Sequence, residues 1–102
     1  MMVMSILTYP LKSSTEVGKK FVEALKKNPA PDYVNRLEIY VRYGGKGIQA
    51  FSPTEITKGK EDEGIKWLVE WYVQFYEIEG VEVELPVVLT AAEALPMIGM
   101  SM

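Results

Sequence analysis

The amino-acid sequence predicts a single α+β domain in which two helices pack on one face of a four-stranded antiparallel sheet. Segments with strand-like and helix-like patterns alternate in the order strand, helix, strand, strand, helix, strand. The length of 102 residues suits one hydrophobic core, and 48% hydrophobic with 25% charged residues is typical of a globular protein. After the last strand, a short apolar stretch predicts a C-terminal helical extension, so that the domain spans residues 1–102.

The first strand and the first helix follow one another closely. Residues 2–9 read as a strand that Pro10 ends. The strand offers two alternative core faces, and the sequence leaves the choice open between Met2/Met4/Ile6 and Val3/Leu7/Tyr9. Ser13 with Glu16 three residues later has the pattern of a capping box, which predicts that a helix begins there and ends before Pro29.

The second predicted strand carries both arginines of the chain. Residues 34–43 alternate with a period of two, which places Arg36, Tyr40 and Arg42 together on one face. The pair Gly44-Gly45 predicts a two-residue hairpin turn, with Tyr43 opposite Lys46. In this register Gln49 and Phe51 of the third strand lie on the same face as the arginines, and a polar loop over residues 53–60 follows.

The second helix is predicted from Glu61 to about Glu79, because acidic residues suit the positive N-terminus of a helix. Its apolar arc is wider than one sheet face requires, so the flank around Trp67 and Trp71 needs a further cover. We expect that cover to come from the apolar tail, residues 95–100, or from a partner subunit.

The last predicted strand, residues 81–89, places Glu82 and Glu84 side by side on one face. Pro86 favours a position at the edge of the sheet, because it cannot donate to the strand ladder. Thr90 and Glu93 again have capping-box spacing and predict the short final helix.

Composition excludes several classes of function. The chain has no cysteine and no histidine, which excludes disulfides, thiolate and imidazole catalysis and the usual transition-metal sites. We therefore expect no bound metal and no cofactor. The net charge of −3 argues against nucleic-acid binding. Since there is no membrane-spanning run and no basic leader, we expect a cytoplasmic protein with no membrane partner.

Four features carry a resemblance to a known family: the order of elements, the tryptophan-bearing second helix, the ending Pro86-Val87-Val88-Leu89 and the Thr90–Glu93 extension. Together they resemble the dimeric α+β barrel superfamily of small ferredoxin-like proteins, and most closely its uncharacterised members. The resemblance implies the strand order fourth, first, third, second. It also implies a homodimer whose open sheet faces pack together and enclose a cavity. Arg36 and Arg42 would then meet Glu82 and Glu84 of the partner subunit.

Two functions from different classes follow. In the first, the homodimer binds a small polar, anionic or aromatic ligand on the open sheet face, because guanidinium groups make forked contacts to carboxylates. Its expected lining is Arg36, Tyr40, Arg42, Gln49 and Phe51. Whether the chain is also a cofactor-independent enzyme stays open. In the second, the domain is a non-catalytic interaction or regulatory module that uses the sheet face or the tail. In both cases the expected dimer interface contains Glu82, Glu84, Trp67 and Trp71.

Overall fold

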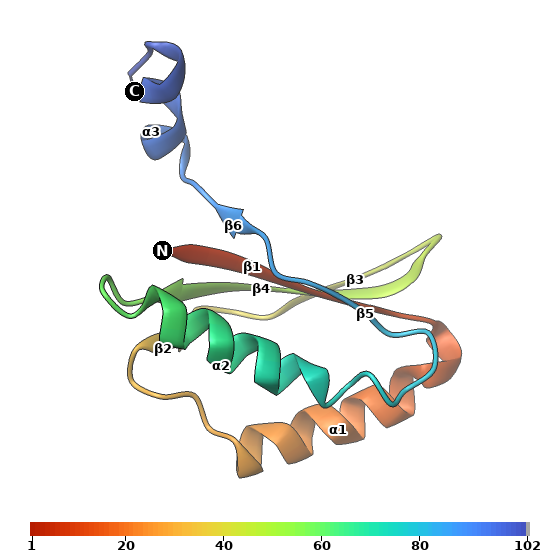
Figure 1. Cartoon of the computed structure of the whole chain (residues 1–102). Helices are drawn as coiled ribbons and strands as arrows, with labels where there is room; N and C mark the ends of the chain where they lie inside the picture. The colour runs from red at the N-terminus through yellow and green to blue at the C-terminus, as the bar shows by residue number, and fades with distance from the viewer. Residues whose placement is uncertain (102) are drawn as a thin grey trace.

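The computed structural model describes residues 1–101 (Figure 1); Met102, the last residue of the predicted domain, lies outside the described part. The strands are β1 (Met2–Tyr9), β2 (Val34–Arg36), β3 (Tyr40–Gly44), β4 (Gly47–Ile56), β5 (Glu82–Glu84) and β6 (Val87–Val88). The α-helices are α1 (Ser14–Lys27), α2 (Glu61–Val73) and α3 (Ala91–Ala94), and single 3-10 turns span Leu11–Ser13 and Leu95–Ile98.

The strands form one antiparallel sheet in the order β2-β4-β1-β5, with β3 also paired to β4 and β6 also paired to β1. This confirms the predicted α+β class and the predicted order of strands. The count of four strands is wrong, because each of the two edge strands is broken into two pieces and the sheet has six strands. The breaks fall at residues 37–39 on one edge and at Leu85-Pro86 on the other.

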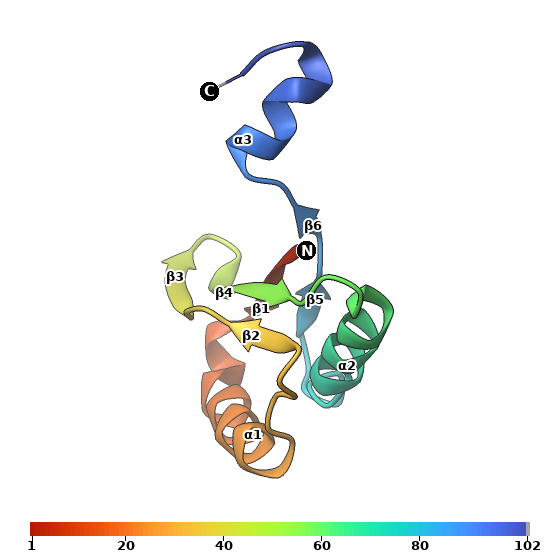
Figure 2. The same cartoon turned by 90° about the vertical axis from the view of Figure 1, so that its left-hand side faces the viewer.

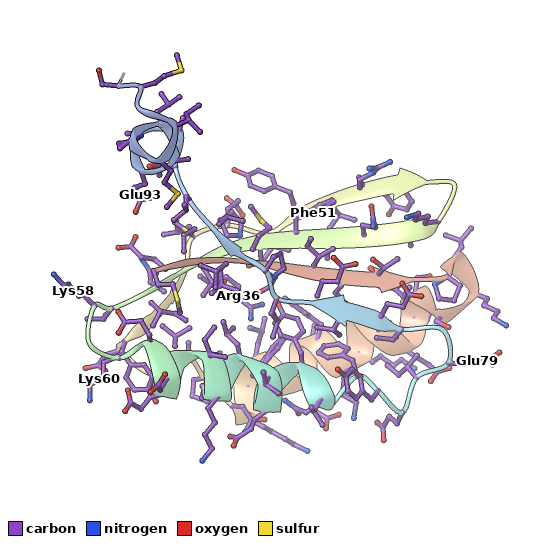
Figure 3. The ribbon with its side chains drawn as sticks, turned by 45° about the horizontal axis from the view of Figure 1, so that its top comes forward. Arg36, Phe51, Lys58, Lys60, Glu79 and Glu93 are labelled. Atoms are coloured by element: carbon purple, nitrogen blue, oxygen red, sulfur yellow. The ribbon has the colours of Figure 1, made fainter. Side chains whose placement is uncertain are left out.

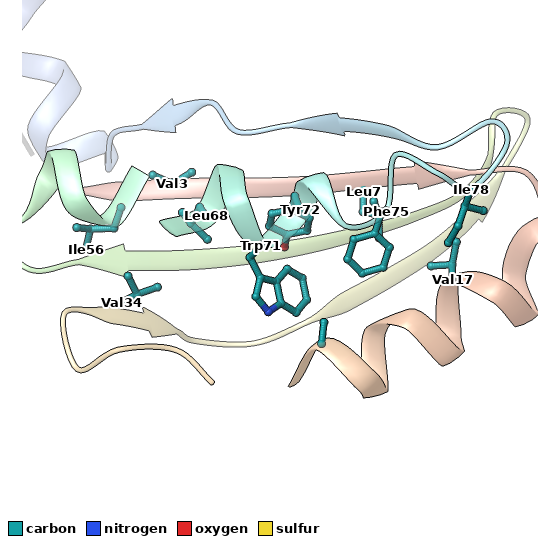
Figure 4. Close-up of a cluster of buried hydrophobic side chains, with 11 residues drawn as sticks. Val3, Leu7, Val17, Val34, Ile56, Leu68, Trp71, Tyr72, Phe75 and Ile78 are labelled. Carbon is teal, nitrogen blue, oxygen red and sulfur yellow. The ribbon is translucent and has the colours of Figure 1, made fainter. Parts of the chain in front are cut away.

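Both long helices pack on the same face of the sheet, and α3 projects from the opposite side (Figures 1 and 2). Val3 and Leu7 are buried on the helix side of β1, which settles the open choice for this strand. The helix side of the sheet also buries the small residues Ser5, Ser52 and Thr54, each at most 3% exposed. Figure 4 shows the larger side chains that fill the space above them, drawn mainly from α2 and the segment that follows it: Leu68, Trp71, Tyr72, Phe75 and Ile78.

A one-residue bulge separates β2 from β3. Arg36 pairs with Thr54 and Tyr40 pairs with Phe51, so three residues on this edge face two on β4. Pro53 explains the break: its carbonyl accepts a hydrogen bond from Leu37 N at 2.9 Å, but it has no N–H to return one. The predicted polar loop over residues 53–60 is therefore wrong at its start, because β4 continues through Pro53 to Ile56.

The bulge reverses the alternation of side chains, so Arg36 points to the helices whereas Arg42 points to the open face. The prediction that both arginines share a face is wrong for this reason. A period-two pattern assumes an unbroken strand, and the extra residue shifts every position before it to the other face relative to those after it.

The hairpin turn between β3 and β4 lies one residue later than predicted. Gly44 pairs with Gly47 and Tyr43 with Ile48, instead of Tyr43 with Lys46. Gly47 has a φ of +98°, and a Cβ at this position would lie 2.5 Å from the carbonyl oxygen of Tyr9. Only glycine fits at position 47, beside the end of β1, and this requirement sets the position of the turn. The register moves by two positions, so the faces of β3 and β4 stay as predicted.

Two helix boundaries also differ from the prediction. The hydroxyl of Ser13 does not cap α1 but donates to the carbonyl of Glu79 at 3.0 Å, which ties the helix start to the chain before β5. Helix α2 ends at Val73 instead of Glu79, and turns carry Phe75 and Ile78 into the core. The capping box at Thr90 is confirmed.

Candidate binding surface on the open face of the sheet

Strand register places the side chains of the open face in rows that cross the sheet. One row runs from Arg42 on β3 through Gln49 and Thr8 to Glu82 on β5. The amide of Gln49 donates to the hydroxyl of Thr8 at 3.2 Å, which joins the two central strands within this row. The row therefore begins with a cation at one edge and ends with a carboxylate at the other.

The next row also ends in a carboxylate, but its other three residues carry no charge. Tyr40 on β3 is followed by Phe51, Ile6 and finally Glu84 on β5. Tyr40 is 61% exposed, whereas Phe51 and Ile6 are half-buried by their neighbours in the sheet. The two glutamates at the β5 edge thus face outward from two consecutive rows.

Farther along the sheet the open face becomes mostly apolar. Met4 pairs with Pro53, and Met2 lies between Glu55 and Val88. Asn35 completes this last row at the β2 edge. Helices α1 and α2 lie on the other side of the sheet, and α3 projects away from the open face, so neither long helix covers these side chains (Figure 2).

Arg36 lies on the other face, in a cage of aromatic rings between the sheet and the helices. Its guanidinium carbon is 4.5 Å from the ring centroid of Trp71, 5.6 Å from that of Tyr72 and 6.0 Å from that of Phe21. Figure 3 shows Arg36 and Phe51 on opposite sides of the sheet. Four of the five predicted lining residues therefore share the open face, and Arg36 does not.

Two buried donors in the cage, Nη1 of Arg36 and Nε1 of Trp71, have no acceptor among residues 1–101. The rings hold the guanidinium in place of a carboxylate, since an arginine over aromatic faces is attracted by their negative charge density. This arrangement is structural: it closes the core where α1, α2 and β2 meet.

The residues expected at the interface occupy different environments. Glu82 and Glu84 are exposed on the open face, as described above. Trp71 is 2% exposed and belongs to the core of the single chain, where α1 covers it through Phe21 at a centroid distance of 5.7 Å. The expected cover from the tail is wrong, because the tail projects away on the other side of the sheet (Figure 1).

Trp67 is half-buried and stacks on Trp71, with ring centroids 6.3 Å apart. It borders a surface hollow of about 330 Å³ that Asn28, Glu70, Trp71 and Gln74 also line. A second hollow, of about 200 Å³, lies at the β3–β4 turn and includes Arg42 and Gln49. Both are shallow compared with an enclosed ligand cavity.

The described residues bring together no group of three or more acidic, histidine or cysteine side chains that could hold a metal ion. Within residues 1–101, no helix is long and apolar enough to cross a membrane.

The sequence prediction missed the half of the open face that β1 contributes: Met2, Met4, Ile6 and Thr8. Ser5 concealed it, because a serine between Val3 and Leu7 breaks the apolar pattern of the side that is in fact buried. Pro53 was the available signal for the bulge, since proline inside a sheet is confined to edges, strand starts and bulges.

No family model matches this chain, and no curated protein matches it. Among solved structures, the chain is similar to the solution structure of the C-terminal domain of the MgtC protein from Mycobacterium tuberculosis. The TM-score is 0.43 at 16% sequence identity, over 88% of this chain and 90% of that chain. This likeness assigns the chain to no family.

Proposed function

We propose that this domain is a self-association module, in which the open sheet face binds a second copy of the chain. The observation that carries the proposal is the uncovered apolar centre of that face. Met2, Met4, Ile6, Phe51 and Pro53 form a continuous patch across β1 and β4. Monomeric proteins rarely leave such patches open to water, because burying apolar surface is favourable by about 25 cal/mol per Å².

The charges at the edges favour one arrangement of two copies. When a two-fold axis runs parallel to the strands between two stacked sheets, it exchanges their edges. Arg42 then lies over Glu82 of the partner subunit, and Tyr40 over Glu84 of the partner subunit. An axis perpendicular to the strands, through the middle of the face, would instead reverse the rows. Arg42 would then lie over Asn35 of the partner subunit and Glu82 over Val88 of the partner subunit, and neither charge would meet an opposite one. By symmetry the parallel axis makes the Arg42–Glu82 ion pair and the Tyr40–Glu84 contact twice each, which would fix the orientation of the dimer.

A ligand cavity between the open faces is not part of this proposal. The predicted lining depended on two arginines acting together, and Arg36 is on the helix side. The remaining residues, Tyr40, Arg42, Gln49 and Phe51, form two regular rows that suit contact with a partner protein.

Light scattering after size exclusion, over a range of protein concentrations, tests the proposal. We expect the wild-type chain to be a dimer and Phe51→Glu to be a monomer, because the new carboxylate would be buried at the centre of the interface. Val22→Glu is the matched control, since Val22 is 52% exposed on α1, away from the open face. A wild-type chain that is monomeric at all concentrations, or a Phe51→Glu variant that dimerises like Val22→Glu, would contradict the proposal.

A further inference from the structure

The C-terminal segment, residues 90–100, is held together by its own hydrogen bonds. The hydroxyl of Thr90 accepts a hydrogen bond from Glu93 N at 3.1 Å, and the Glu93 carboxylate accepts one from Thr90 N at 3.0 Å. At the other end, Met100 N donates to the carbonyl of Leu95 at 3.0 Å. Within residues 1–101, every hydrogen bond of this segment stays inside it, and neither α3 nor the turn after it contains a buried residue.

This segment carries large apolar side chains that its own chain leaves in water. Met97 is 74% exposed, Ile98 72% and Met100 56%. The open face has the same property, because α1 and α2 do not cover its central patch across β1 and β4 (Figure 2). Since burying apolar surface is favourable, these two uncovered surfaces of one chain would both be stabilised by contact with each other.

The segment and the patch lie next to each other. Val88, the last residue of β6, pairs with Met2 at the corner of the open face. Only Leu89 and Thr90 separate β6 from α3. Figures 1 and 2 both show α3 on the side of the sheet opposite α1 and α2, standing off from this end of the face. The segment is therefore tethered at one end of the patch and on its open side.

The lengths of the segment and the patch also agree. Four residues of α3 at about 1.5 Å each and four of the following 3-10 turn at about 2.0 Å each give a unit roughly 14 Å long. Along β1, Met2 and Ile6 are four steps of about 3.4 Å apart, which is also roughly 14 Å. A unit of this length, laid along β1 from the Met2 end, would cover the apolar side chains and stop before the charged row at Thr8.

We propose that residues 90–100 form a strap that closes over the open face of their own chain and competes there with the second copy. The inference rests on the self-association proposed above, whose regulation it names. Closure needs rotation only at Leu89 and Thr90, because no hydrogen bond among the described residues joins the strap to the sheet. The tether gives the strap an effective concentration at the patch that does not depend on protein concentration. Because a closed chain cannot dimerise, the strap weakens dimerisation according to the fraction of chains that are closed.

A cross-link within one chain tests the closed state directly, because the chain has no cysteine of its own. Met4 lies in the middle of the patch, and we treat a dilute chain that carries Met4→Cys and Ile98→Cys with a short bis-maleimide. We expect the two sites to be joined within single chains, as read by mass spectrometry of proteolytic fragments. The matched control combines Ile98→Cys with Val22→Cys, which is exposed on α1. An internal yield no higher than in this control would overturn the proposal.

A substitution in the full-length chain tests the competition. Ile98→Glu would place a carboxylate under the closed strap, so it favours the open chain and frees the face for a second copy. We expect its dimer dissociation constant, measured by sedimentation, to fall roughly tenfold or more below wild type, whereas Val22→Glu leaves the constant unchanged. A constant for Ile98→Glu that equals that of Val22→Glu, or exceeds it, would refute the competition. The self-association would still stand if Phe51→Glu abolished dimerisation.

The two proposals can fail separately. If the wild type and Ile98→Glu are both monomeric at every concentration, the self-association is refuted, and the strap has no second copy to compete with. Internal cross-linking above the control level in such a monomer would retain the strap as the cover of the open face. Cross-linking at the control level would refute the strap as well.

Discussion

The guanidinium carbon of Arg36 lies 4.5 Å from the ring centroid of Trp71, on the side of the sheet that the helices cover. No carboxylate accompanies it: the ion pairs within residues 1–101 are all made by lysines. One of its nitrogens, Nη1, is buried and has no hydrogen-bond partner in the described part of the chain. The aromatic rings therefore provide the main electrostatic support for a cation at the boundary of the core.

Substitution of Arg36 will separate charge from packing. We expect Arg36→Met to lower the free energy of unfolding by about 1 kcal/mol, the scale of a partly desolvated cation–π contact. Arg36→Ala should cost about 2–3 kcal/mol, because it also removes the aliphatic stem and leaves a cavity. Urea unfolding followed by tryptophan fluorescence measures both. An Arg36→Met chain more stable than wild type would show that the unpaired donor outweighs the ring contacts.

Two helical glycines should respond in opposite ways to alanine. A Cβ at Gly64 would lie 2.5 Å from Cγ2 of Ile56, so α2 packs against β4 at the limit that glycine allows. We expect Gly64→Ala to destabilise the fold by about 1–3 kcal/mol through overpacking. At Gly18 a Cβ meets nothing within 4 Å, and Gly18→Ala should stabilise α1 by about 0.5–1 kcal/mol. Thermal unfolding of both variants checks the contrast, and equal shifts of the same sign would contradict it.

Two charge reversals on the open face should compensate each other in the proposed dimer. Arg42→Glu and Glu82→Arg each place like charges opposite one another in the proposed dimer, so each should weaken dimerisation. The double variant restores opposite charges in exchanged positions and should recover most of the lost affinity. Sedimentation at low salt is the suitable measurement, because the effect falls with ionic strength. Additive losses in the double variant would rule out this pairing of edges.

The tail helix should respond to acid. Hydrogen bonds from the backbone N–H of Thr90, and then from its side chain, lower the pKa of Glu93 below its ordinary value. Because the folded-state pKa is the lower one, the cap stabilises α3 fully above the unfolded pKa of about 4.3. That stabilisation is lost as the pH falls through the folded value. Amide chemical shifts of residues 91–94 should report this transition between neutral and acid pH, and Glu93→Gln should abolish it.

The sequence was sufficient for the order of elements, because hydrophobic periodicity and turn residues are local signals. The order of strands came from the ferredoxin-like topology that this order of elements resembles. The Thr90 capping box was equally readable, since both partners lie within four residues. Ser13 shows the limit of prediction from local signals. Its hydroxyl donates to the carbonyl of Glu79, a partner 66 positions away, and does not cap its own helix. Contacts of that range depend on the packed fold and leave no mark in local spacing.

The open face was predicted only in part for a related reason. Tyr40, Arg42, Gln49 and Phe51 were placed together correctly, because β3 and β4 form a tight hairpin whose register is local. Arg36 was misplaced because the bulge depends on Pro53, which lies on the neighbouring strand. The burial of Trp71 also depends on a long-range partner, Phe21 of α1, and no helical wheel of α2 alone could show it.

The bulge changes which alternate residues on this edge of the sheet point into the core. Up to Arg36, even-numbered side chains belong to the interior; from Tyr40 onward, even-numbered side chains belong to the exterior. A relative with one residue fewer between these positions would need no bulge, because regular alternation over the shorter segment would itself place the counterpart of Arg36 inside and that of Tyr40 outside. An alignment without a gap across residues 37–39 would then match interior positions of this edge with exterior positions of the relative. The length of this short segment must therefore be compared before the faces of the two strands are.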